Sequence, residues 1–179
     1  VRSCSKDYAA PYFKRVMGDS FDYFKVRDRR RELVAEAIQK QGATPKPGVS
    51  ELLQFCQENG IRTAVATATA KDLAVERLKM AGIPMQFSMI VGGDQVQHGK
   101  PEPEIYLRAA EALQLNPREC VAMEDSPNGI YAAFSAGCRV IMVPDLTQPE
   151  QCFQPLLLGV AQTIDKAIPI LEKEVCAHA

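Results

Sequence analysis

From residue 49 onward, apolar residues recur in two alternating patterns. Apolar positions three or four residues apart predict helices at 49–59, 71–81, 104–113, 127–136 and 165–175. Short apolar runs typical of buried strands lie between them, at 61–66, 89–91, 120–123 and 139–143. Three of the helices are followed by Gly60, Gly82 or Gly137, and glycine suits the left-handed position that ends a helix. Because strands that alternate with helices at this spacing are parallel, the pattern predicts a doubly wound α/β domain over residues 44–179.

The first 43 residues have a different pattern. Residues 28–41 are expected to form a helix that ends at Gly42, and the segment before it is rich in aromatic residues with helical spacing. Pro45 and Pro47 then exclude a helix and mark a boundary between two parts of the chain.

Composition narrows the class of protein. Apolar residues make up 46% of the 179 and charged residues 24%, as in soluble globular proteins, and the net charge is −1. Such a balance gives no electrostatic footprint for nucleic acid, and no apolar run is long enough to cross a bilayer. The segment 1–7 has no apolar signal-peptide region, so we expect a cytoplasmic protein. Six scattered cysteines without a C-x-x-C pair are expected to be reduced and mostly buried.

Polar residues that could bind a ligand or take part in catalysis follow three of the predicted strands. The strand 61–66 runs into Thr67-Ala68-Thr69, where a hydroxyl and free backbone N–H groups suit an anion, although Thr69 could simply cap the next helix. Lys100 lies between a glycine and a proline, where its side chain can reach a phosphoryl oxygen or merely extend into solvent.

The third group is an acidic pair. Glu124 and Asp125 follow the strand 120–123, and two adjacent carboxylates suit Mg²⁺, although they also favour the dipole of the next helix. Ser126 and Pro127 are expected at the N-cap and first position of that helix. A hydroxyl, a lysine and an acidic pair that converge at one edge of a parallel sheet are the equipment for phosphoryl transfer.

These motifs resemble the haloacid dehalogenase (HAD) superfamily, and in particular its β-phosphoglucomutase-like group, whose helical cap is inserted after the first motif. The matching segments are A-V-A-T-A-T at Thr67, G-K-P-E-P-E-I-Y at Lys100, and V-A-M-E-D-S-P-N-G at Glu124 and Asp125. The resemblance covers residues 44–179 and implies that residues 1–43 are part of the cap.

One motif of that family is absent from the sequence. The family nucleophile lies in an Asp-x-Asp motif after the first strand, and none of the nine aspartates here is followed two residues later by another. The family's first strand lies in the middle of the sheet, so its absence would leave two inner strand edges unpaired. We therefore expect a truncated sequence that lacks about 40–50 residues before Val1, the length of a strand, a loop and a helix.

The resemblance implies a Mg²⁺-dependent enzyme that hydrolyses a small phosphorylated metabolite through an aspartyl phosphate. Thr67, the Ala68 N–H and Lys100 would bind the phosphoryl group, and Asp125 and Glu124 would hold the metal. Lys6, Arg27 and Asn128 are candidate substrate contacts. A β-phosphoglucomutase-type phosphomutase and a non-catalytic HAD-like protein are the alternatives, while the substrate and the oligomeric state stay open.

Overall fold

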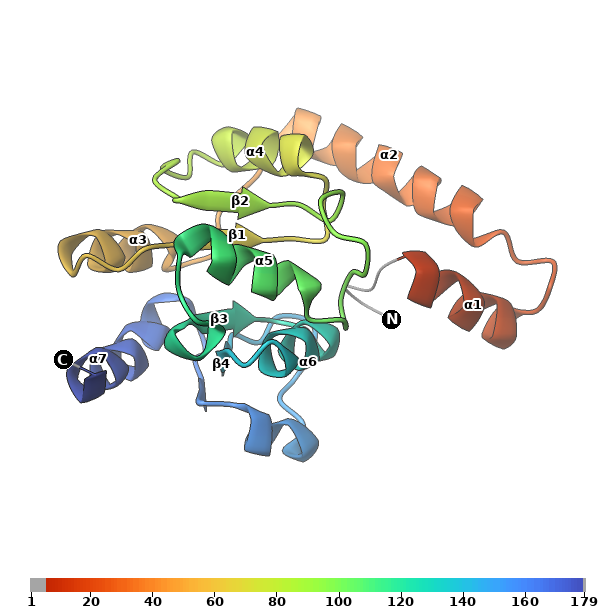
Figure 1. Ribbon diagram of the computed structural model, residues 1–179. Helices are drawn as coiled ribbons and strands as arrows, with labels where there is room; N and C mark the ends of the chain where they lie inside the picture. Colours follow the sequence, from red (N-terminus) through yellow and green to blue (C-terminus); the bar gives the residue numbers. More distant parts are fainter. Residues whose placement is uncertain (1–5, 179) are drawn as a thin grey trace.

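Short parallel strands form the centre of the protein, which is seen here in a computed structural model that describes residues 6–178, with side chains to residue 174 (Figure 1). The strands are β1 (Ala64–Ala66), β2 (Met89–Val91), β3 (Val121–Glu124), β4 (Arg139–Met142) and β5 (Gly159–Val160). β1 pairs with β2, with Ala64 opposite Met89, and β3, β4 and β5 pair in that order. Since every pair is parallel, the predicted α/β class with a parallel sheet is confirmed.

Helices connect these strands and flank them. The α-helices are α1 (Lys6–Met17), α2 (Tyr23–Gln41), α3 (Val49–Glu58), α4 (Lys71–Met80), α5 (Glu104–Leu113), α6 (Pro127–Ser135) and α7 (Ile168–His178), and the short 3₁₀ helices are η1 (Pro117–Glu119), η2 (Gln151–Leu156) and η3 (Asp165–Ala167). As predicted, Gly60, Gly82 and Gly137 follow helices with φ of +65°, +66° and +94°.

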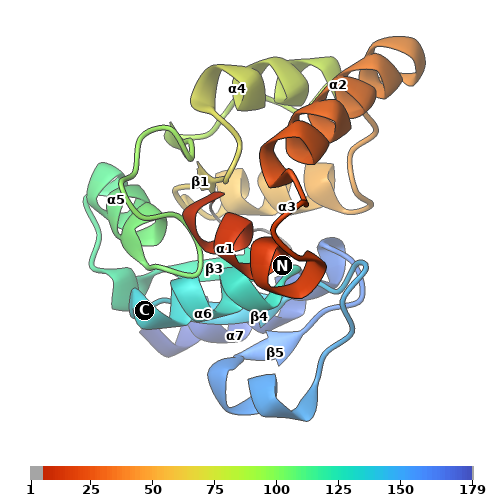
Figure 2. The same ribbon diagram turned by 90° about the vertical axis from the view of Figure 1, so that its right-hand side faces the viewer.

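Two apolar cores lie on opposite faces of the strands because side chains alternate along a strand. On β4, Val140 and Met142 join the core that also contains the buried faces of α5 and α6. Ile141 and Val143 point the other way, into a core with Leu171 of α7. Figure 2 shows α5 and α6 on one side of the strands and α3 on the other. This coverage of both faces is what the doubly wound pattern predicts.

The layer of strands is divided between β1 and β3, which are not paired with each other in the structure of residues 6–178. Backbone N–H and C=O groups of alternate residues in a strand point to opposite edges. The Thr67 N–H donates to the Val91 C=O (3.0 Å), so odd-numbered residues of β1 face β2. The backbone groups of Ala64 and Ala66 therefore face β3.

The opposing edge of β3 is also open. The Cys120 C=O accepts from Arg139 N–H (3.1 Å) and the Glu124 C=O from Val143 N–H (2.8 Å), so even-numbered residues of β3 face β4. The backbone groups of Val121 and Met123 consequently face β1. We call the space between residues 64–66 and 121–124 the slot. The unpaired inner edges expected from the sequence are thus confirmed.

Several predicted boundaries were wrong. The helix predicted at 28–41 begins at Tyr23, because the Asp22 side chain accepts from Lys25 N–H (3.0 Å) and caps it. Only residues 64–66 of the strand predicted at 61–66 belong to β1, and the helix predicted from 165 starts as η3. β5 was not predicted, because two residues carry no alternation.

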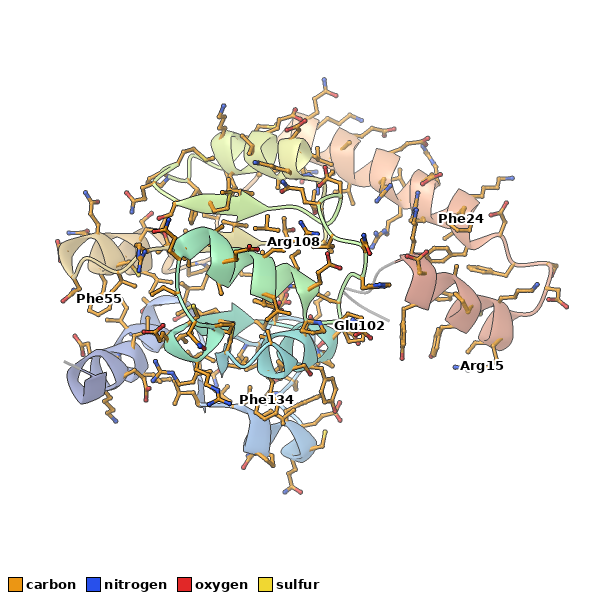
Figure 3. All side chains as sticks on the ribbon, in the orientation of Figure 1. Arg15, Phe24, Phe55, Glu102, Arg108 and Phe134 are labelled. Carbon is orange, nitrogen blue, oxygen red and sulfur yellow. The ribbon has the colours of Figure 1, made fainter. Side chains whose placement is uncertain are left out.

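Helices α1 and α2 extend beyond the α/β part, on the side toward which β1 and β3 point (Figure 1). Ala9 is the only buried residue of α1 in its described part, and α2 has none. Phe13 stacks on Phe21 and Tyr23, with centroids 5.6 and 5.7 Å apart, and Figure 3 shows Phe24 on the side of α2 that faces α1. Neither helix meets the length and apolarity of a membrane span, nor does any other described helix.

The cysteines differ in exposure, which gives a first prediction. Cys56 and Cys138 are buried, and burial raises the pKa of the Cys138 thiol to about 11, whereas Cys152 is exposed. Only the thiolate reacts readily, and at pH 8 a thiol with that pKa is ionised to roughly one part in a thousand. Iodoacetamide at pH 8 should therefore modify Cys152 in the folded protein and Cys138 only after unfolding, as measured by peptide mass mapping. Equal rates for both would contradict the burial of Cys138.

Candidate active site

The slot widens into a cavity of about 1070 Å³ that receives residues from both sets of strands. Its walls are largely apolar, with Leu52, Val65 and Met123 among them. The five residues predicted to bind phosphate and metal all line this cavity, namely Thr67, Ala68, Lys100, Glu124 and Asp125. Strand direction brings together Thr67 and Ala68, which follow β1, with Glu124 and Asp125 at the end of β3, and Lys100 comes from the loop before α5. Figure 3 shows Glu102, two residues after Lys100, at the end of the α/β part that faces α1.

Lys100 and Glu124 form a buried ion pair, with side chains only 7% exposed. The Lys100 ammonium also donates to the Ala66 carbonyl oxygen (3.3 Å) and the Tyr106 hydroxyl (3.1 Å). Tyr106 in turn donates to Glu124 Oε1, the oxygen that Lys100 contacts. Burial, and then the Glu124 charge, raise the pKa of the Tyr106 phenol well above its ordinary value, so it stays a protonated donor. Lys100 is therefore not the exposed surface lysine that the sequence left open.

The second oxygen of Glu124 faces the start of α6. It accepts from the Asp125 N–H (3.2 Å) and the Ser126 hydroxyl (3.4 Å). Ser126 also accepts from Gly129 N–H (3.3 Å) as the N-cap of α6, which confirms the predicted cap. A Cβ at Gly129 would collide with the Glu124 carboxyl carbon, so only glycine allows this carboxylate to lie against the helix.

Asp125 is the more accessible member of the acidic pair. Its side chain is 30% exposed and lies 3.9 Å from the ammonium of Lys46, which is 3.3 Å from Asp145. In the described part of the chain, no three acidic, His or Cys residues cluster closely enough to hold a metal. The donor set therefore fits Mg²⁺ in part: Asp125 offers a carboxylate at the cavity, while both oxygens of Glu124 already accept hydrogen bonds.

The loop after β1 is held by the loop after β2. The Thr67 hydroxyl accepts from Thr69 N–H (3.2 Å), and the Thr69 carbonyl accepts from Gly93 N–H (2.9 Å). The carboxylate of Asp94 accepts from Lys71 N–H (2.8 Å) and so caps α4 from another loop. Thr69 does not cap this helix, as the sequence had allowed, because the N-cap position falls at Ala70.

Removal of the Asp94 cap should loosen this loop. For Asp94→Ala we expect a loss of about 1 kcal/mol in the free energy of unfolding, the usual cost of a lost N-cap, and weaker binding of phosphate near Thr67. Urea unfolding and phosphate titration measure the two effects. Glu76→Gln, at an exposed position on α4, is the control. Equal stability and phosphate affinity in both variants would contradict the capping role.

The three candidate substrate contacts do not line the cavity in the described structure. Lys6 is exposed at the start of α1, and Asn128 is half-buried in the first turn of α6. Arg27 pairs with the neighbouring Asp28 (2.9 Å) and lies over the Phe24 ring, so its guanidinium is engaged within α2. Their role in substrate binding stays a prediction.

Sequence reasoning missed the supporting residues of this site: Tyr106, Lys46, Asp94 and Gly129. Tyr106 lies in the same motif as Lys100, six residues later. In the structure its hydroxyl accepts a hydrogen bond from the Lys100 ammonium. That spacing was the available signal. Lys46 and Asp94 act across loops distant in sequence, which no local pattern reveals.

A parallel α/β sheet with a lysine and two acids at its carboxyl edge is an arrangement that suits phosphoryl transfer. A family model described as haloacid dehalogenase-like hydrolase matches residues 10–137, and the chain belongs to this family. It is 35% identical to a phosphorylated carbohydrates phosphatase of Thermotoga maritima over 79% of this chain and 72% of the relative. It is 41% identical to hexitol phosphatase A of Escherichia coli over 60% of this chain and 50% of the relative.

The fold is also similar to a solved structure, that of a protein described as a putative β-phosphoglucomutase from Thermotoga maritima. The TM-score is 0.73 at 27% identity, and the match covers 94% of this chain and 78% of the other. These findings support the resemblance to the β-phosphoglucomutase-like group. The chain spans between half and about three quarters of the length of the two curated relatives.

Proposed function

We propose that this protein is a Mg²⁺-dependent phosphatase of small, sugar-like phosphorylated metabolites. The observation that carries the proposal is that Thr67, Ala68, Lys100, Glu124 and Asp125 line one cavity at the carboxyl edge of parallel strands. The phosphatase names of the two curated relatives support the reaction and the substrate class.

In this proposal each residue acts on the phosphoryl group or on the metal. The Thr67 hydroxyl and the Ala68 N–H donate to phosphoryl oxygens, and the Lys100 ammonium offsets their charge. Asp125 would hold Mg²⁺, and Glu124, whose oxygens are already hydrogen-bonded, would contribute directly or through water. Bound Mg²⁺ would withdraw charge from the phosphoryl oxygens and orient the group for attack.

The nucleophile is proposed to come from a strand that fills the slot. A strand running parallel to β1 and β3 would end beside Thr67 and Asp125, so an aspartate just after it would face the phosphoryl group. The same aspartate would add the carboxylate that the metal site lacks among the described residues. We further propose that residues 1–43 belong to a helical cap that closes over this edge.

The experiment is an assay of the protein expressed from its complete reading frame. With Mg²⁺, it is expected to release inorganic phosphate from sugar phosphates or sugar alcohol phosphates, and EDTA should stop the release. With β-glucose 1-phosphate, appearance of glucose 6-phosphate would instead support the phosphomutase, the alternative favoured by the structural similarity. A folded protein that releases phosphate from no compound of either class would overturn the proposal.

The source of the nucleophile has its own test. The coding sequence upstream of Val1 is expected to encode an apolar strand followed by Asp-x-Asp. A start codon at or just before Val1 without that motif would favour the non-catalytic alternative.

A further inference from the structure

The Lys100 ammonium has no spare donor in this structure. An ammonium donates three hydrogen bonds, and three acceptors surround it: the Ala66 carbonyl, the Tyr106 hydroxyl and Glu124 Oε1. If Lys100 binds a phosphoryl oxygen, as the proposed function requires, it has to give up at least one of these bonds. If Lys100 gives up its bond to Glu124, another group has to keep the Glu124 carboxylate in place.

Glu124 is 8% exposed, and loss of a partner is costly for a buried carboxylate. Its Oε2 is held by Asp125 N–H and the Ser126 hydroxyl, which do not involve Lys100. Its Oε1 has two side-chain donors, Lys100 and Tyr106. When the lysine turns away, the tyrosine is the donor that remains.

The position of Tyr106 suits this task. It lies on the buried face of α5 between the strands and α6, where Ile105 and Ala109 are also buried, and it is itself 8% exposed. Its ring lies 4.9 Å from the Lys100 ammonium, so the phenol and the ammonium are packed together. A rigid helix and a packed ring fix the hydroxyl without help from solvent.

We propose that Tyr106 is a positioning residue whose hydroxyl keeps Glu124 Oε1 bonded, so that Lys100 is free to turn toward a phosphoryl oxygen. This inference rests on the proposed function of the Thr67–Lys100 site. It assigns to the tyrosine a role in phosphate affinity that acts only through Lys100.

The test is a double-mutant cycle on affinity for inorganic phosphate in the presence of Mg²⁺, measured by titration calorimetry on the full-length protein. In Tyr106→Phe, a turn of Lys100 toward phosphate leaves Glu124 Oε1 without its side-chain donors, so affinity should fall about tenfold. Tyr131→Phe is the matched control, because Tyr131 is 43% exposed on α6 and packs on Phe153. It should bind phosphate like the parent protein.

The double-mutant cycle distinguishes a role of Tyr106 that acts through Lys100 from a general contribution of Tyr106 to the stability of the fold. In a Lys100→Gln background, Tyr106→Phe should have no further effect, because no lysine remains to be released; in a Thr67→Ala background its effect should add in full. Thermal unfolding checks that every variant is folded, and Lys100→Met, which keeps a side chain of similar length without the charge, replaces Lys100→Gln if that variant does not fold.

Two results would overturn the inference alone: unchanged affinity in Tyr106→Phe, or a loss that persists undiminished in Lys100→Gln. A different result bears on the proposed function. If neither Thr67→Ala nor Lys100→Gln weakens phosphate binding, the proposed site is wrong, and the role of Tyr106 fails with it.

Discussion

Lys100→Ala is expected to lower phosphatase activity by about a thousandfold and to destabilise the fold in the same step. On the proposed function, the loss of activity follows because no ammonium remains to offset the charge of the phosphoryl oxygens. The loss of stability follows because Glu124 would stay buried without its cation, which costs about 3–5 kcal/mol for a broken buried pair. Steady-state kinetics and urea unfolding measure the two effects.

A second change separates the two effects. In the double variant Lys100→Ala, Glu124→Gln, the buried side chain is neutral, so much of the stability should return while activity stays low. Lys79→Ala, at an exposed position on α4, is the control for loss of a lysine. A Lys100→Ala protein as stable as Lys79→Ala would contradict the burial of the ion pair, and one as active would contradict its role at the site.

The helices that the sequence predicted well are those whose ends are marked by a capping residue in the sequence itself. Gly60, Gly82 and Gly137 end helices at positive φ, and Ser126 with Pro127 starts α6, because each device works within one turn. The convergence of Thr67 and Asp125 was also predictable, since strand direction brings strand ends to one edge, and Lys100 joins them from the loop between β2 and α5.

What the sequence did not predict depends on contacts between distant segments. Asp94 caps α4 across 23 positions, and Tyr106 acts on Glu124 across 18. Asp94 lies in a segment with no special pattern, and although Tyr106 lies in the motif of Lys100, only the folded arrangement shows that it contacts Glu124. The cysteines, which the sequence predicted to be mostly buried, differ: Cys56 and Cys138 are buried and Cys152 is exposed, since an apolar neighbourhood in sequence does not fix burial.

The second large effect concerns the slot between β1 and β3. Unpaired strand edges over an apolar cavity are sites of aggregation, so the 179-residue chain by itself should have low stability and a tendency to associate. A strand that fills the slot adds hydrogen bonds on both edges and removes apolar side chains from water. We expect a gain on the order of 5 kcal/mol, or about 10–20 °C in Tm, when the sequence encoded upstream of Val1 is included.

Hydrogen exchange tests where such a strand lies, because alternate backbone groups face opposite edges. The amides of Val65 and Ala122 face β2 and β4, so they should be protected in both forms of the protein. The amides of Ala64, Ala66 and Met123 face the slot, so they should exchange quickly in the 179-residue chain and slowly in the longer one. The matched control is the longer chain with a proline substituted at the centre of the upstream strand. Because proline cannot donate to the ladder, this strand should protect the slot-facing amides less. Slow exchange of all five amides in the shorter chain would mean that β1 and β3 have closed on each other. The slot would then not be the place from which the nucleophile reaches Thr67 and Asp125.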